Sequence, residues 1–383
     1  MKATIIKKPL VEILARCQGV ANKKSTMPVL ANVLIEDEDD GTIRVSATDL
    51  YSAVSGTVSG KVETPGKIAV PARDLLERVK MMPDGKNVIL ETDKHAGSLS
   101  LKAEGTKRRY TMHGIPGEDF PPLPKPGDDA EVVPLDANAL GQLIAAVHFS
   151  ISNDETRLHL NSALLECGAH VGERVVRMVS TDGHRLSRFE LTVDDPFPDC
   201  SMLIPLKGVT ELKRICDDMR GKEGASAVRM IRSEPNLFFE AHGLTFSVKL
   251  VDAQFPPYQQ VIPESTTREA TVPRVDMMAA LRAVAVSTNE KVGGVTMTLC
   301  ENAVTLKGQS PESGDGFDEV TAQYEGTEES FGLNARYALD VLGATESDEA
   351  IIQCSGPLDP IILRPKTNPD GTDYLCVIMP QRI

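Results

Sequence analysis

"LVEILARC", residues 10–17, decides the fold, because the same apolar pattern occurs three times along the chain. Its apolar side chains fall at Leu10, Ile13, Leu14 and Cys17. The stretches "LGQLIAAV" (140–147) and "MMAALRAV" (277–284) carry the same pattern. Apolar residues at positions i, i+3, i+4 and i+7 predict a helix with one buried face. The sequence therefore predicts three helices of one design, one in each third of the chain.

Two further sets of similar segments support an internal repeat. "VPARDLLERV" (70–79), "IPLKGVTELK" (204–213) and "LNARYALDVL" (333–342) predict a second helix in each third. "YTMHGIPGEDFPPLP" (110–124) and "FSVKLVDAQFPPYQQVIP" (246–263) resemble each other and close the first two thirds. Short alternating segments such as "TIRVSA" and "NLFFEA", separated by turn residues, predict strands between these points.

Each third is therefore an α+β unit with two helices and antiparallel sheets. The predicted order is a strand, a helix, three or four strands, a helix and four strands. The unit boundaries are 1–124, 131–262 and 270–383, with linkers at "KPGDDAE" (125–131) and "PESTTREA" (263–270). Asp136 and Asp276 precede two of the helices and are candidate N-caps. Repetition of one unit three times favours a curved body or a ring.

Composition limits the classes of function. The chain has 383 residues and a net charge of −14, which argues against a protein coated in nucleic acid but allows a local basic surface. Seven scattered cysteines without a CxxC pair indicate reduced thiols in a cytoplasmic protein. Seven dispersed histidines and the absence of HExxH predict neither a metal site nor a cofactor. Charges throughout residues 1–17 are unlike a signal peptide, and no apolar run is long enough to span a membrane.

"TDGHRLSRF" (181–189) is the segment richest in chemical groups. Asp182, His184 and the neighbouring Ser180 raise the possibility of a nucleophilic triad. However, residues two apart on a strand point to the same side, and the chain has no GxSxG, GxxxxGK[ST] or GxGxxG motif. Thr48-Asp49 occupies the equivalent place in the first unit, so both Asp residues are predicted to cap the same turn. A binding surface is favoured, and a turn with a buried histidine is the structural alternative.

The longest motifs resemble one family, the bacterial DNA polymerase III beta subunit or replication sliding clamp. "STDGHRLSRFEL", "FSVKLVDAQFPPYQQVIP", "LIPLKGVTEL", "VSTNEKVGGV" and "VIMPQRI" carry the resemblance in the second and third units. "MPVLANVLIE", "SATDL" and "VPARDLLE" carry it in the first. The resemblance spans the whole chain in the same order.

This resemblance implies a non-catalytic processivity factor. It implies a head-to-tail homodimer, closed as a ring of six similar domains around double-stranded DNA, whose sequence it does not read. A clamp loader, replicative and translesion polymerases, and repair proteins are the implied further partners. Those carrying a short clamp-binding motif would dock between the second and third domains.

The resemblance also assigns roles to residues of this chain. It implies a partner-peptide site formed by Arg157, Leu160, Thr181, Gly183, His184, Arg185, Leu186, Pro256, Val261, Val377 and Met379. It implies DNA contacts by Lys24, Arg73 and Lys207. Helix placement adds further candidate cations, among them Arg78, Lys80, Lys213, Arg214, Arg220, Arg282 and Arg336. For the subunit joint it implies Tyr110 and Met112 of one copy near Val286 and Ser287 of the other.

The chain departs from the family pattern at four positions. Gln260 stands where a basic residue is expected, and Gln381 where Met is common. Leu158 and His159 replace a pair of aromatic residues after Arg157. These changes bear on peptide preference and on stacking against DNA. The rival functions are a DNA-binding regulator, which would bind linear fragments tightly and with sequence preference, and an enzyme that depends on His184.

Overall fold

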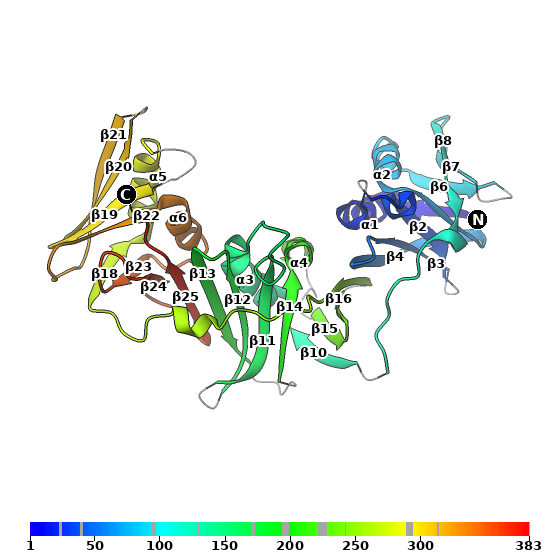
Figure 1. The fold of residues 1–383 in the computed structure, drawn as a ribbon. Helices are drawn as coiled ribbons and strands as arrows, with labels where there is room; N and C mark the ends of the chain where they lie inside the picture. The colour runs from blue at the N-terminus through cyan, green and yellow to red at the C-terminus, as the bar shows by residue number, and fades with distance from the viewer. Residues whose placement is uncertain are drawn as a thin grey trace. The chain divides into compact units, whose positions relative to one another are not determined.

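The structure is a computed structural model. It describes residues 1–22, 25–38, 41–93, 97–128, 130–135, 137–170, 173–193, 199–220, 228–241, 243–288, 294–311 and 314–382. These residues form α+β repeats with antiparallel strand pairing throughout (Figure 1). Within them, no helix has the length and apolar character needed to cross a membrane.

Three repeats follow one order: a strand, a helix, four strands, a helix and three strands. The first contains β1 (Lys2–Ile6), α1 (Lys7–Val20), β2 (Asn32–Asp37), β3 (Thr42–Thr48), β4 (Ser52–Thr64), β5 (Lys67–Pro71), α2 (Ala72–Lys80), β6 (Asn87–Thr92), β7 (Ser98–Ala103) and β8 (Arg109–His113), followed by the short β9 (Ile115–Pro116). The second contains β10 (Glu131–Leu135), α3 (Ala137–Val147), β11 (Ser162–His170), β12 (Glu173–Thr181), β13 (Arg185–Thr192), β14 (Cys200–Pro205), α4 (Leu206–Met219), β15 (Val228–Ser233), β16 (Asn236–Ala241) and β17 (Leu244–Lys249). The third contains β18 (Arg268–Pro273), α5 (Arg274–Ala285), β19 (Gly294–Cys300), β20 (Ala303–Ser310), β21 (Gly314–Thr321), β22 (Glu329–Asn334), α6 (Ala335–Gly343), β23 (Glu349–Cys354), β24 (Ile361–Pro365) and β25 (Thr372–Ile378).

The sequence pattern predicted the helices better than the strands. The apolar stripes of α1, α3 and α5 are buried, as their spacing predicted. The expected fourth strand after the second helix is present in the first repeat as the short β9 but was wrong for the second repeat. In its place, "FPPYQQVIP" forms an extended connection with a single 3-10 turn at Tyr258–Val261, because its prolines lack the N–H groups of a strand ladder. Asp276 is not an N-cap, since α5 starts two residues earlier, directly after the extended Pro273.

The chain divides into two compact units, residues 1–137 with 219–250, and residues 138–218 with 251–383. In the first unit, the main sheet has the order β10-β15-β16-β17-β4-β1-β6-β7-β8. In the second unit, one sheet has the order β14-β11-β12-β13-β25-β24-β23-β18 and another the order β21-β20-β19-β22. Each unit therefore contains one sheet that continues from one repeat into the next.

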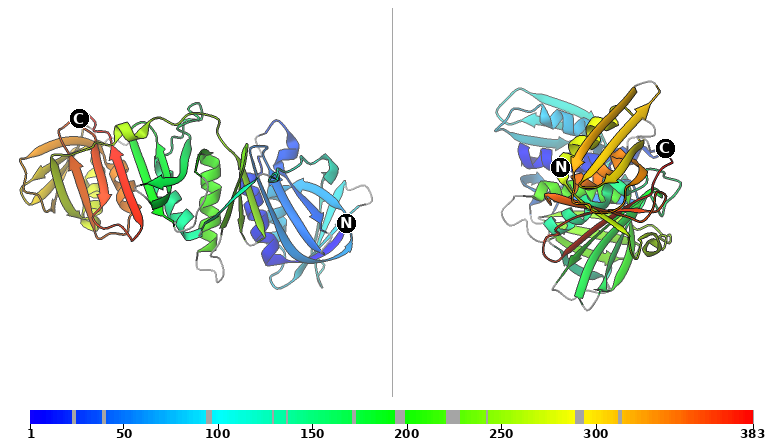
Figure 2. Two further views of the ribbon diagram at one scale, coloured as in Figure 1. Left: turned by 90° about the horizontal axis from the view of Figure 1, so that it is seen from below. Right: turned by 90° about the vertical axis from the view of Figure 1, so that its left-hand side faces the viewer.

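These continuous sheets form by the same strand pairing. The fourth strand of the first repeat, β4, pairs with the last strand of the second, β17, with Ser52 opposite Val248. The fourth strand of the second repeat, β13, pairs with the last strand of the third, β25, with Leu186 opposite Val377. Figure 2 shows β13 and β25 side by side, in green and red. Both pairings are antiparallel.

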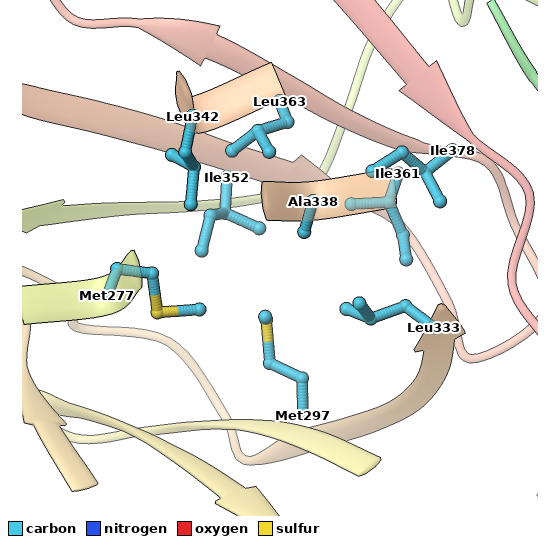
Figure 3. A pocket seen from close by; sticks show the side chains of 9 residues that line it. All are labelled: Met277, Met297, Leu333, Ala338, Leu342, Ile352, Ile361, Leu363 and Ile378. Carbon is cyan, nitrogen blue, oxygen red and sulfur yellow. The ribbon is translucent and has the colours of Figure 1, made fainter. Parts of the chain in front are cut away.

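The interior of the third repeat is closed. Nine apolar residues of α5, α6 and the two sheets surround a cavity of about 10 Å³ (Figure 3). They are Met277, Met297, Leu333, Ala338, Leu342, Ile352, Ile361, Leu363 and Ile378. A space this small has no room for a ligand, and its apolar lining gives a water molecule no partner. The interior of this repeat therefore serves packing, and the functional groups lie elsewhere.

Candidate functional site

The turn between β12 and β13 is held by its own side chains. Asp182 Oδ1 accepts hydrogen bonds from the backbone N–H groups of His184 (2.9 Å) and Arg185 (3.0 Å). Thr181 Oγ1 donates to the carbonyl of Arg185 (2.6 Å) and accepts from the N–H of Gly183 (3.1 Å). Gly183 has φ +93°, a conformation that a glycine adopts without strain. The result is a rigid tip that exposes Gly183 and His184.

The β3–β4 turn repeats this arrangement. Asp49 Oδ1 accepts from the N–H groups of Tyr51 (2.9 Å) and Ser52 (2.6 Å). Thr48 Oγ1 donates to the carbonyl of Ser52 (3.0 Å), and Leu50 takes the place of Gly183 with φ +75°. The predicted equivalence of the two Thr-Asp pairs is confirmed, so Asp182 has a structural task.

The geometry does not form a nucleophilic triad. Ser180 is buried and its hydroxyl donates to the carbonyl of Val147 (2.5 Å). Ser187 is also buried, with its hydroxyl 2.6 Å from that of Ser150. His184 is exposed, so the alternative of a buried histidine is wrong as well. Among the described residues, no group of three or more His, Cys, Asp or Glu side chains could hold a metal ion.

An apolar cluster lies across the seam between the second and third repeats. Its buried members come from β11 to β14, from β24 and β25, and from the connection after β17: Leu164, Val179, Leu186, Leu203, Tyr258, Ile362, Leu375 and Val377. Val251, Phe255 and Ile262 pack against it from that connection. Val261 and Met379, at 41% and 37% exposure, bring apolar side chains to the surface here. We call this region the seam cluster.

Tyr258 fixes the connection to the sheet. Its hydroxyl donates to Glu166 Oε2 (2.8 Å) and accepts from Arg177 Nη1 (3.0 Å). Arg177 also donates to Glu190 Oε2 (2.8 Å), which is buried. Burial, together with the hydrogen bond to Glu166, raises the pKa of Tyr258 to about 12, so it stays a neutral donor. The path of residues 251–262 over the sheet is therefore set by polar as well as apolar contacts.

Several of the predicted peptide-site residues are joined by contacts near this seam. The carbonyl of His184 accepts from the N–H of Met379 (2.9 Å), which joins the hairpin tip to the C-terminal segment. A Cβ atom on Gly183 would lie 3.5 Å from Nη2 of the exposed Arg157. Leu160 is buried, and its N–H donates to the carbonyl of Arg157 (2.8 Å). The remaining predicted residues lie on the turn, on the paired strands or on the connection: Thr181, Leu186, Val377, Pro256 and Val261.

One member of the set lies deep in the structure. Arg185 is predicted to line the peptide site, and its side chain is 8% exposed. Its guanidinium bonds to Asp182, to Asp340 and to the carbonyl of Phe149. These contacts turn it away from the surface and into the joint with α6. Leu160, Leu186 and Val377 are also covered, at 2% exposure or less, so they support the surface from beneath.

Two of the three predicted DNA contacts belong to the described residues, and both lie on helices. Arg73 is exposed on α2 and forms an ion pair with Glu77 (2.8 Å). Lys207 is exposed in the first turn of α4. Lys24 lies outside the described residues. Among the other candidates, Lys213 also has an acidic neighbour, Asp217, at 2.8 Å.

The four residues predicted for the subunit joint differ in their exposure. Val286, directly after α5, is 79% exposed, and Ser287 is half-buried. Tyr110 is half-buried on β8, and Met112 on the same strand is 5% exposed. Sequence reasoning missed Phe317, which is 66% exposed on β21. Its signal was a lone aromatic residue among acidic ones in "GDGFDEV" (314–320).

Family models match almost the whole chain. Residues 1–124 match the N-terminal domain of the DNA polymerase III beta subunit, residues 134–257 the central domain and residues 259–382 the C-terminal domain. The beta sliding clamp of Caulobacter vibrioides is 30% identical over 388 residues, with 100% of each chain covered. That of Escherichia coli K12 is 28% identical over 384 residues, again with 100% of each covered.

Solved structures agree with these matches. A sliding clamp from Bartonella birtlesii bound to griselimycin is 31% identical, with a TM-score of 0.91 and 100% of each chain covered. A sliding clamp from Caulobacter crescentus is 29% identical, with a TM-score of 0.90 and the same coverage. The repeated fold and the full-length matches lead to one conclusion. This chain belongs to the family of the DNA polymerase III beta subunit, the bacterial sliding clamps, which are non-catalytic processivity factors of that polymerase.

Proposed function

We propose that two copies of this chain join head to tail in a ring of six repeats that encircles duplex DNA. The observation that carries the proposal is a strand pairing that occurs twice within the chain. In each case, the fourth strand of one repeat pairs with the last strand of the next repeat. Applied a third time, this pairing leaves the fourth strand of the third repeat, β21, and the last full strand of the first repeat, β8. Both end their sheets in the described part of the chain. Pairing of β21 with β8 of a second copy would satisfy both edges.

The two edges are chemically complementary. β21 carries Asp315, Asp318 and Glu319, whereas Lys107, Arg108 and Arg109 lie at the start of β8. Phe317 and Val286 give the acidic side exposed apolar area. Tyr110 and Ser287 complete the proposed joint, with Met112 supporting β8 from inside its repeat. A joint made of two different surfaces is heterologous. It gives a closed ring only if the rotation from one copy to the next returns to the first copy.

We infer three domains with the boundaries 1–124, 131–262 and 270–383. β10 begins at Glu131, and the described residues between 121 and 130 form no helix or strand, whereas β18 begins at Arg268, two residues before the third boundary. The three stretches that match the family's domain models support these boundaries to within a few residues at most ends.

DNA is held in this proposal by weak attraction to phosphates. Lys24, Arg73 and Lys207 are the proposed contacts. Acidic neighbours such as Glu77 and the net charge of −14 keep the attraction low, which suits a protein that slides. A clamp loader would place the ring on DNA, and the protein would act in the cytoplasm with the chromosome.

We propose that polymerases and repair proteins dock at the seam cluster through a short apolar motif. The exposed tip offers the carbonyl of Gly183 to an extended peptide, because the N–H groups of Gly183 and His184 and the carbonyl of His184 already have partners within the chain. Val261 and Met379 supply adaptable apolar contacts at the surface. Arg157, Leu160, Thr181, Leu186, Pro256 and Val377 complete the site, and Arg185 acts from behind it. Gln260 and Gln381 lie near the margin and tune the preference for side chains.

Fluorescence anisotropy with a labelled Gln-Leu-x-Leu-Phe peptide tests this proposal. The His184→Ala, Met379→Ala double variant should raise the Kd at least about tenfold, equivalent to about 1.4 kcal/mol. A matched double variant, Val132→Ala with Leu358→Ala, removes two exposed apolar side chains elsewhere and should bind like the wild type. A folded, dimeric wild type that does not bind the peptide would contradict docking at this seam.

A further inference from the structure

The guanidinium of Arg185 is almost completely enclosed. Nε donates to Asp182 Oδ2 (3.0 Å), Nη1 donates to Asp340 Oδ2 (2.7 Å), and Nη2 donates to the carbonyl of Phe149. All three nitrogens thus have a fixed partner. An arginine is suited to this task because its planar fork presents donors in fixed directions.

Two aromatic rings add to these bonds. The central carbon of the guanidinium lies 4.3 Å from the ring centroid of Tyr337 and 5.2 Å from that of Phe149. Both distances are within the range of cation–π attraction, which strengthens when the charge is shielded from water. Tyr337 and Asp340 are three residues apart on α6, so they share one face of that helix.

The elements that meet here belong to different repeats. Arg185 begins β13 in the second repeat, one residue after the exposed tip residue His184. α6 lies in the third repeat and carries the exposed Arg336 next to Tyr337. One side chain therefore ties the hairpin to a helix of the neighbouring repeat.

We propose that Arg185 is a positioning residue, and that Asp340 and Tyr337 hold the hairpin tip through it in the geometry that a partner peptide requires. This inference rests on the docking function proposed above. It gives Asp340 and Tyr337, which belong to no predicted site, a part in partner affinity. Loss of either contact removes the support that α6 gives to the tip and leaves its local hydrogen bonds in place, so the peptide must restore the position of the tip on binding.

The ion pair of Arg188 with Asp373 provides a matched comparison. It too joins β13 of the second repeat to a strand of the third, β25, through an arginine and an aspartate. It lies farther along the strand, away from the tip. Asp373→Asn therefore removes one cross-repeat ion pair and leaves the Arg185 contacts in place, whereas Asp340→Asn acts on the tip.

The first measurement is hydrogen exchange of the segment 178–190, followed by mass spectrometry, in the full chain. We expect Asp340→Asn to speed exchange at the tip at least about fivefold, a typical effect of losing a residue that couples two sites. Asp373→Asn should leave the tip unchanged. Tyr337→Leu, which removes the ring but keeps both charges, should act in the same direction as Asp340→Asn. If Asp340→Asn folds poorly, Tyr337→Leu takes its place in the test.

The second measurement is the Kd of the labelled peptide for the same variants, together with their melting temperatures. We expect a Kd about tenfold higher for Asp340→Asn at nearly unchanged melting temperature, and a wild-type Kd for Asp373→Asn and Tyr337→Phe. Unchanged exchange at the tip in both Asp340→Asn and Tyr337→Leu would overturn the positioning role. Faster exchange with an unchanged Kd would overturn its effect on affinity. Faster exchange in a protein whose wild type binds no peptide would uphold positioning and reject the docking function instead.

Discussion

Gly183 and Leu50 occupy equivalent turns with positive φ, but only Gly183 adopts this conformation without strain. Gly183→Ala should therefore lower the free energy of unfolding by about 1 kcal/mol, because an L-residue is disfavoured in the left-handed region. Leu50→Gly should leave stability unchanged or raise it by up to about 1 kcal/mol, since Leu50 is 52% exposed and contributes little burial. Urea denaturation measures both. A Gly183→Ala protein as stable as the wild type would show that the turn relaxes.

His148 predicts a dependence of stability on pH. Burial lowers its pKa, and Lys213 of α4 lowers it further, while Asp340 of α6 opposes the shift. The unfolded chain therefore binds the proton more readily than the folded one. Stability should fall as pH drops below about 6.5 and continue to fall towards the lower folded pKa.

His148→Gln removes this linkage, so its melting temperature should decline less between pH 7 and pH 5 than that of the wild type. The exposed Val132 provides the control, because Val132→Ala changes no titrating group and should keep the wild-type decline. Parallel pH profiles for the wild type and His148→Gln would assign the dependence to other groups.

At the residue scale, sequence predicted what is local. The Asp182 turn followed from the repeated Thr-Asp pair, because its hydrogen bonds span only two or three residues. The task of Arg185 could not be predicted, since Asp340 is 155 residues away along the chain. The burial of Met112 could not be predicted for a related reason: alternation along β8 gives two faces, and only the folded repeat shows which face is inside.

At the element scale, the proposed joint between β21 and β8 predicts that single charges dissociate the dimer. Val286→Asp or Phe317→Asp replaces exposed apolar area of the proposed joint with a carboxylate that would lose its water when the joint forms, and should shift sedimentation at micromolar concentration from dimer to monomer. Leu358→Asp changes another exposed apolar residue of the same repeat, away from β21, and should remain dimeric. Dimers that persist in both joint variants would place the interface elsewhere.

Helices were predicted more reliably than strands for a physical reason. The stripes of α1, α3 and α5 follow from one periodicity, and burial of that face is required wherever the helix packs. Strand pairing depends on contacts between distant segments. The continuity of β13 with β25 joins residues such as Leu186 and Val377, and no local pattern in the chain indicates it.

At the scale of the whole molecule, DNA retention should depend on topology and salt. The loaded wild type should stay on circular DNA and leave after linearisation, whereas a sequence-specific regulator would stay on both. Arg73→Glu with Lys207→Glu should reduce the slope of log affinity against log salt by about two for duplex DNA. Lys61→Glu reverses one charge in the same way on strand β4, outside the proposed DNA contacts. It should keep the wild-type slope. An unchanged slope in the double variant would remove these two residues from the DNA contact.

The difference between β8 and β21 has a consequence for direction. Two copies joined through unlike edges are related by a rotation about the axis of the hole, not about an axis across it. Both copies of the hairpin Thr181–Leu186 then face the same end of the duplex. Two enzymes could therefore wait on one side of the same primer terminus and exchange there without release of the ring. Such a protein distinguishes upstream from downstream although it reads no base.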